Sequence, residues 1–149
     1  MLAEFQQALV DLIASPELVV QVRAEPSILG RKYQLTDREF RRLVTIVWHR
    51  GMRSNCILYR ANRLAPLALN VPDICKSLGS NLRDLASEFW KTHPETHVHF
   101  FIETDRFCRF LKARVANGAN FGAKFEEALA RESAIITAAL AESHIEREN

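Results

Sequence analysis

The residue types best suited to recognition chemistry gather in residues 51–64. If this stretch is a helix, Arg53 and Arg60 share a face and Arg63 lies one turn beyond Arg60. An adjoining polar strip carries amide and phenol groups, from Asn55, Tyr59 and Asn62. Because a guanidinium group binds a carboxylate through two parallel hydrogen bonds, this face suits a carboxylate-rich peptide or a neighbouring subunit. The alternative is a solvated helix side whose arginines pair with acidic residues of the same fold.

A second cluster contains the donor types that bind transition metals. Its imidazole and carboxylate groups belong to His93, Glu95, His97, His99, Glu103 and Asp105. His93 and His97 have the i, i+4 spacing of a helical metal site, whereas His97 and His99 project together only from a strand. No single backbone conformation places all three imidazoles on one side. Polar or interface histidines are therefore the favoured interpretation, and a metal site is the alternative.

Nucleophilic catalysis has little support in the sequence. The cysteines, Cys56, Cys75 and Cys108, are odd in number and lack CxxC spacing, which argues against disulfides and structural zinc and favours a reduced, cytoplasmic setting. The first and the last lie among apolar residues, as small packed side chains do. The chain also lacks GxSxG, P-loop and GxGxxG motifs. We therefore assign no catalytic residue, no metal ligand and no cofactor to this chain.

The composition indicates one globular domain. Apolar residues make up 48% of the 149 residues and charged residues 26%, while five Gly and five Pro are too few for a fold of many tight turns. These values predict a single all-α domain over residues 1–149, with six to eight helices of mixed length. The net charge of +2 hides an Arg-rich stretch, residues 31–63, with nine basic and two acidic side chains, and an acidic stretch at 121–149.

Hydrophobic periodicity and capping residues indicate where the helices begin and end. Helices are predicted over about 2–14, 16–25, 36–50, 52–64, 72–79, 81–92 and 121–141, with a loop at 26–35. Most of residues 95–116 is predicted to be helical as well. Thr36 and Glu39 have the spacing of a capping box. A short extended segment near 97–102 and a frayed tail over about 142–149 are also expected. No apolar run is long enough to span a bilayer and no signal peptide is evident, so we expect a cytoplasmic protein that does not contact membranes.

Aromatic residues at helical spacing are expected in the core. Phe100 and Phe101 are the exception, because they could instead anchor a partner helix or strand.

Four short motifs occur in an order and spacing that identify a family resemblance. They are Leu58-Tyr-Arg-Ala-Asn-Arg-Leu64, Phe89-Trp-Lys-Thr-His-Pro94, Phe107-Cys-Arg-Phe-Leu111 and Ala128-Leu-Ala-Arg-Glu-Ser-Ala134. Over roughly residues 36–140 the chain resembles the small partner proteins of multinuclear non-heme iron (DUF692-type) oxidative enzymes. These enzymes modify cysteine in ribosomally synthesised peptides (RiPPs), a branch of natural product biosynthesis. The likeness is greatest to the partner protein of the thiaglutamate pathway, and the methanobactin partner is more distant.

The resemblance implies a non-catalytic subunit. In that family the larger, barrel-shaped subunit holds the iron and performs the oxidation, and the small protein binds it as a heterodimer and holds the precursor peptide. In the thiaglutamate pathway the reaction excises the β-carbon of a C-terminal cysteine. The chain would thus be required for activity without being an enzyme itself. The predicted partner- or peptide-binding residues are Arg53, Asn55, Tyr59, Arg60, Asn62, Arg63, Phe100 and Phe101.

One departure from the family affects how the peptide would bind. Some relatives continue after the last long helix into a β-rich segment that can pair with the leader peptide as an added strand. Here the sequence ends at Asn149, soon after the predicted last helix. Strand addition is then expected only if residues 97–102 are extended, and a peptide lying on helical surface is the competing expectation.

Two other functions compete with the partner subunit. The first is a helical nucleic-acid-binding transcriptional regulator, whose phosphate contacts would come from Arg38, Arg41, Arg42, Arg50, Arg53 and Arg60. The modest net charge argues against it. The second is an enzyme with a metal at the histidine cluster.

Overall fold

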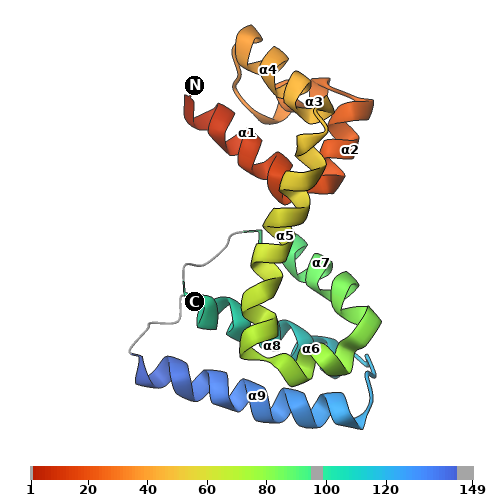
Figure 1. Ribbon diagram of the computed structural model, residues 1–149, viewed down its shortest axis with the longest axis vertical. Coiled ribbons are helices and arrows are strands. Elements are labelled where there is room, and N and C mark those ends of the chain that lie inside the picture. The colour runs from red at the N-terminus through yellow and green to blue at the C-terminus, as the bar shows by residue number, and fades with distance from the viewer. Residues whose placement is uncertain (1, 95–98, 144–149) are drawn as a thin grey trace. The chain divides into compact units, whose positions relative to one another are not determined.

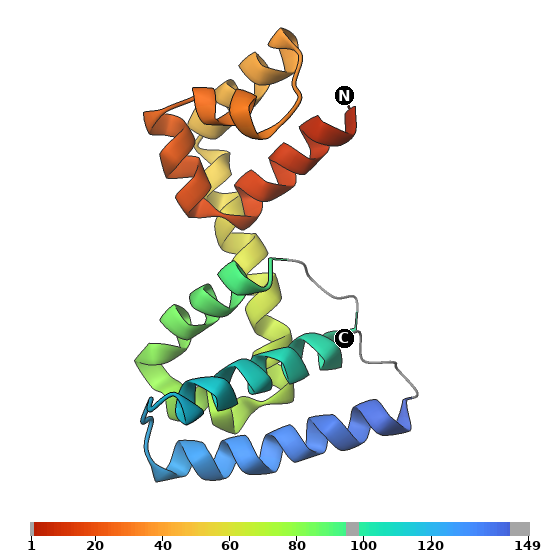
Figure 2. The same ribbon diagram turned by 180° about the vertical axis from the view of Figure 1, so that it is seen from behind.

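The computed structural model describes residues 2–94 and 99–143, and every regular element within those ranges is a helix (Figures 1 and 2). The predicted all-α class is confirmed for this part of the chain. In chain order the elements are α1 (Leu2–Ala14), α2 (Pro16–Ala24), α3 (Ser27–Lys32), α4 (Asp37–Trp48), α5 (Gly51–Asn70), α6 (Pro72–Leu78), the 3-10 turn η1 (Gly79–Asn81), α7 (Leu82–Thr92), α8 (Phe100–Ala116) and α9 (Ala123–Glu142). From residue 144 onward the predicted tail lies outside the described residues.

The chain divides into two compact units, Met1–Asn62 and Arg63–Asn149, and each has its own hydrophobic core. Helix α5 is continuous through the division and contributes to both units. The single domain expected for residues 1–149 therefore stays a prediction.

In the first unit, capping side chains set where the helices begin. Ser15 accepts a hydrogen bond from the Leu18 amide at the start of α2. At the start of α4, the Thr36 hydroxyl accepts from the Glu39 amide and the Glu39 carboxylate accepts from the Thr36 amide, so the predicted capping box is present. The far end of α4 is held by Arg23, whose guanidinium donates twice to the Val47 carbonyl.

The core of the first unit explains a helix that the sequence did not predict. The sequence predicts a loop over residues 26–35, yet Ser27–Lys32 forms α3. Leu29 is fully buried and Tyr33 is 6% exposed, so tertiary burial stabilises this turn of helix. The buried members of this core are Ala8, Leu12, Leu18, Val19, Val22, Leu29, Tyr33, Leu43, Val47, Met52 and Cys56.

The second unit packs α5, α6, α7, α8 and α9 around an aromatic core. Phe89, Phe107 and Phe125 are fully buried, and the first two meet edge to face with ring centroids 5.2 Å apart. Helix α5 was expected to end near Leu64, but it continues through Pro66 to Asn70. The Pro66 ring is buried, and this burial offsets the hydrogen bond that proline cannot donate. The predicted break after α8 is confirmed, with Gly118 at φ +93°.

A buried carboxylate joins α9 to the start of α6. The N-cap residue of α6 is Val71, which has no side-chain acceptor, and Pro72 follows it. Glu132 of α9, 6% exposed, fills this role: its Oε1 accepts from the Asp73 amide at 3.0 Å and its Oε2 from the Ile74 amide at 2.8 Å. The carboxylate thus satisfies two amides that the helix leaves unpaired, at the end where the helix dipole favours negative charge.

We predict that Glu132→Ala lowers the free energy of unfolding by about 1–3 kcal/mol, because both amides lose their buried acceptor. Urea denaturation followed by circular dichroism measures the change. Glu127→Ala is the matched control, since that residue is exposed on the same helix and should change stability by less than about 0.5 kcal/mol. Equal effects of the two substitutions would show that the cap contributes nothing.

Candidate functional site

Helix α5 carries the predicted recognition motif, and it divides the motif residues between its inner and outer sides. Arg53, Asn55 and Asn62 are exposed, and Tyr59 is half-buried. Arg60 turns inward within the first unit, where its Nη2 contacts both carboxylate oxygens of Glu17 at 3.0 and 3.2 Å. An arginine paired within its own fold is the alternative that the sequence left open, and this is the case for Arg60.

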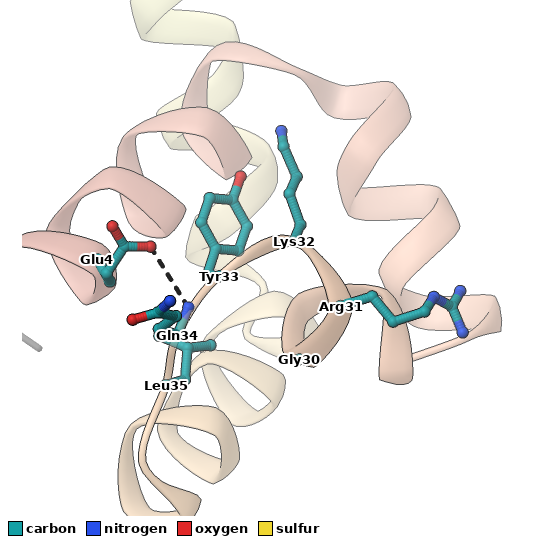
Figure 3. A pocket seen from close by; sticks show the side chains of 7 residues that line it. All are labelled: Glu4, Gly30, Arg31, Lys32, Tyr33, Gln34 and Leu35. Atoms are coloured by element: carbon teal, nitrogen blue, oxygen red, sulfur yellow. Dashed lines mark hydrogen bonds between the residues drawn. The ribbon is translucent and has the colours of Figure 1, made fainter.

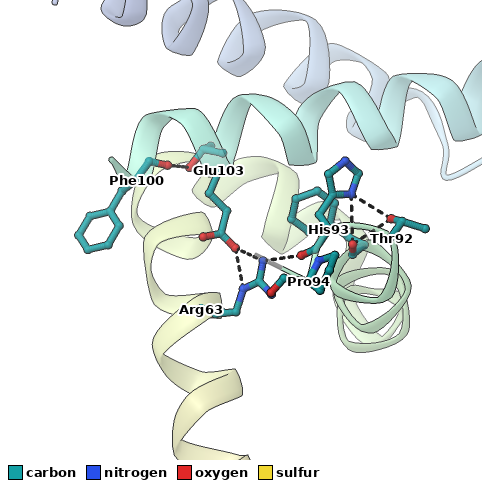
Figure 4. Close-up of polar contacts among 8 residues, drawn as sticks. Arg63, Thr92, His93, Pro94, Phe100 and Glu103 are labelled. Carbon is teal, nitrogen blue, oxygen red and sulfur yellow. Dashed lines mark hydrogen bonds and ion pairs between the residues drawn. The ribbon is translucent and has the colours of Figure 1, made fainter. Parts of the chain in front are cut away.

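Arg63 is buried in the second unit rather than presented at its surface (Figure 4). Its Nε and Nη2 contact Glu103 Oε1 of α8 at 2.8 and 2.7 Å. Nη2 also donates to the His93 carbonyl and Nη1 to the Pro94 carbonyl, at 3.0 and 3.3 Å. The guanidinium lies 5.5 Å from the centre of the Trp90 ring. Arg63 therefore joins α5, α8 and the end of α7, and this placement gives no support to the predicted contact with a partner or peptide.

Phe100 and Phe101 lie in the first turn of α8, with 60% and 40% of their surface exposed. The Phe100 side chain points outward in Figure 4. Residues 100–102 are helical, so the predicted extended segment is wrong for this part of 97–102, and residues 97 and 98 lie outside the described residues. The helix is held here by Thr104, whose hydroxyl donates to the Phe100 carbonyl at 2.7 Å and accepts from the Asn70 amide at 3.1 Å.

Three described members of the predicted histidine and carboxylate cluster, His93, Glu103 and Asp105, pack or pair within the fold. His93 stacks on Phe89 with centroids 4.6 Å apart, and its Nδ1 lies 2.9 Å from the Thr92 hydroxyl (Figure 4). Glu103 pairs with Arg63, and Asp105 pairs with Arg109 at 2.6 Å. Within residues 2–94 and 99–143, no three histidine, cysteine or acidic side chains are grouped as metal ligands would be. Glu95 and His97 lie outside those ranges, so the predicted cluster is only partly described.

All three cysteines are buried free thiols. Burial raises the pKa of all three thiols. The pKa of Cys75 rises to about 11 and that of Cys108 to about 12. A thiol nucleophile needs the opposite shift, toward thiolate at neutral pH, together with access to solvent. These side chains thus have the environment of packed residues.

A polar pocket of about 450 Å³ opens in the first unit beside the α3–α4 connection (Figure 3). Its lining residues are Glu4, Gly30, Arg31, Lys32, Tyr33, Gln34 and Leu35. The Tyr33 hydroxyl donates to Asp11 Oδ2 at 2.5 Å, and Lys32 pairs with the same oxygen at 3.1 Å. Burial, followed by this hydrogen bond, raises the pKa of Tyr33 to about 12. Because Arg31 also pairs with Glu25, the charged groups here are already engaged within the fold.

The outer side of α5 is apolar, a feature that the sequence motifs do not indicate. Ile57, Leu58 and Leu69 expose 58%, 60% and 80% of their surface. Exposed alanines continue the same side of the helix at Ala61, Ala65 and Ala68. Positions 58, 61, 65 and 68 have the alternating spacing of three and four residues with which one helix packs against another. We call these six residues the outer stripe of α5.

The outer stripe distinguishes α5 from an ordinary surface helix, which is apolar on one side only. The inner side of α5 already buries Met52 and Cys56 in the first core and Leu67 in the second. An apolar stripe in solvent on the opposite side is typical of a helix that binds another protein. Asn55 and Asn62 flank the stripe and could donate hydrogen bonds at its rim.

Comparison with protein families, with curated proteins and with solved structures finds no match to this chain. None of the described helices is long and apolar enough to cross a membrane.

We predict that Arg63→Ala destabilises the fold by about 3–5 kcal/mol, because it leaves Glu103 as an unpaired buried charge. Arg60→Ala should cost about 1 kcal/mol or less, since its partner Glu17 is nearly half exposed. Urea denaturation of the two variants measures the difference. If Arg63→Ala is no more destabilising than Arg60→Ala, the ion pair is not a structural element.

The cysteine environments predict slow modification of the folded protein. At about pH 8, a thiol reagent such as dithionitrobenzoate should leave Cys75 and Cys108 unmodified over minutes, because both are neutral and buried. In guanidinium chloride all three thiols should react at once. A thiol that reacts in the folded protein as fast as free cysteine would contradict the assignment of these residues to packing.

Proposed function

We propose that this chain is the non-catalytic partner subunit of a larger multinuclear iron oxidase that modifies a cysteine of a ribosomally made precursor peptide. It binds the iron subunit as a heterodimer and presents the peptide, and the iron stays in the larger subunit. The proposal combines the order of the four sequence motifs with one structural observation, the outer stripe of α5. That stripe lies on the helix that carries the Tyr-Arg-x-Asn motif.

The outer stripe has the composition of a protein interface. Its large members, Ile57, Leu58 and Leu69, supply apolar area, and the alanines between them allow a partner helix to approach closely. Exposed Arg53, Asn55 and Asn62 lie beside it as a polar rim. A chain that acts by docking needs such a surface, and the side chains of the stripe are exposed.

The peptide-binding part of the proposal depends on exposed donors and aromatic rings. Arg53, with no ion pair to any described residue, can receive a carboxylate, while Arg60 and Arg63 are already paired. The exposed Phe100 and Phe101 offer rings for an apolar peptide side chain. Because the described part of residues 97–102 is helical, we favour a peptide lying on helical surface over an added strand.

We predict that Leu58→Asp weakens binding to the iron subunit by about 2 kcal/mol or more, roughly 30-fold in Kd, because it places a charge in an apolar contact. The test is co-expression with a barrel-shaped iron protein of the kind that the proposal requires, followed by size exclusion and titration. Ile135→Asp on α9 is the matched control, since Ile135 is 59% exposed and lies outside the stripe.

The possible results test the proposed function and the proposed contact surface separately. If the wild-type chain and the iron protein migrate separately at micromolar concentration and the iron protein is fully active alone, the proposed function is wrong. If the wild-type chains associate but Leu58→Asp binds as tightly as the control, the partner role stands and the outer stripe is not the contact.

A further inference from the structure

Helix α4 presents a different surface, one rich in arginine. Its exposed side carries Arg38, Arg41, Arg42 and Thr45, which recur at the spacing of one helix face. The opposite side buries Leu43 and packs against α1 and α2, so the arginine side faces solvent. Arg50 and Arg53, directly beyond α4, are exposed as well.

Among the described residues, these arginines form no ion pair with an acidic side chain. The first unit has nine basic and six acidic side chains. Five of the acidic ones are engaged elsewhere: Glu4 with the Gln34 amide, Asp11 with Lys32 and Tyr33, Glu17 with Arg60, Glu25 with Arg31, and Glu39 in the capping box. Within residues 2–94 and 99–143, no ion pair involves Arg38, Arg41, Arg42, Arg50 or Arg53.

The arginine side belongs to a helix that is held firmly at both ends. Helices α3 and α4 are joined by the four residues 33–36, the connection length of a helix-turn-helix. Tyr33 anchors the connection to Asp11, and the capping box fixes the first turn of α4. At the other end, the Arg23 guanidinium donates to the Val47 carbonyl at 3.0 and 2.8 Å. The arginines are thus presented on a preorganised element.

We infer that the exposed side of α4 binds duplex DNA through its phosphates, with α4 in the major groove. A helix about 10–12 Å across fits the groove of about 12 Å, and guanidinium forks bind phosphate oxygens bidentately. An acidic peptide is the rival ligand. It fits less well, because positions 38, 41, 42 and 45 carry no apolar side chain, and the exposed Trp48 beside them already has the Arg23 guanidinium over its ring at 5.4 Å. Phosphate binding needs only charge and donors. The inference does not depend on the outer stripe of α5.

The test is fluorescence anisotropy of a labelled 20-base-pair DNA duplex of generic sequence, titrated with the full-length chain at several salt concentrations. We expect micromolar binding at about 50 mM salt and a slope of log K against log salt of about −3 to −4.5, as for three to five phosphate contacts. The double variant Arg38→Gln/Arg42→Gln should reduce the magnitude of that slope by about 2.

The matched control is Arg83→Gln, because Arg83 is an exposed arginine of α7 without an ion pair to a described residue. It should leave the slope unchanged, and circular dichroism confirms that each variant is folded. The inference is overturned if the duplex does not bind at about 50 mM salt, or if the double variant retains the wild-type slope. It is also overturned if a glutamate-rich peptide binds more tightly than the duplex, since the surface would then serve an acidic protein.

Discussion

The structure depends on helix α5, which contributes buried residues to both hydrophobic cores. Met52 and Cys56 pack into the first core, and Leu67 packs into the second. Two arginines of this helix also form ion pairs within the fold. Arg60 pairs with Glu17 in the first unit, and Arg63 pairs with Glu103 in the second. The inner side of α5 is therefore committed to the fold, and only the outer side is free to act on other molecules.

This constraint changes how the arginine-rich motif is interpreted. In the sequence the arginines of the motif are equivalent, but the structure shows that they differ in burial. Arg63 contacts Glu103, His93 and Pro94 of its own unit, and removing it would leave a buried carboxylate without its cation. Under the proposed function, recognition by α5 would use its apolar outer stripe and the amides beside it. A surface of this kind supplies affinity through buried apolar area, and its polar rim supplies specificity.

The two exposed surfaces of the first unit have opposite chemistry. The outer stripe contributes Ile57, Leu58 and Ala61 there, and it suits a protein partner that excludes water. The exposed side of α4 contributes arginines, and it suits a ligand that carries negative charge. Their affinities should respond differently to salt, because screening weakens phosphate contacts while leaving apolar contacts nearly unaffected.

The sequence predicted correctly those features that depend only on neighbouring residues. The capping box at Thr36 and the break near Gly118 follow from residues within one turn of the chain, and the structure has both. Features that depend on distant residues were not predictable in this way. The burial of Leu29 and Tyr33 stabilises α3, burial of the Pro66 ring allows α5 to continue, and Glu132 caps α6 from a helix some 58 residues away. The spacing of the outer stripe is visible in the sequence. It does not distinguish an interface from a core-facing side, because both sides of a helix use the same apolar residue types at the same spacing.

The most direct test of the partner role is the heat capacity change on binding, measured by isothermal titration of this chain into the iron subunit at several temperatures. Docking through the outer stripe of α5 buries apolar surface, so we predict micromolar or tighter binding with a clearly negative heat capacity change. Absence of binding, or binding with a heat capacity change near zero, would contradict the account.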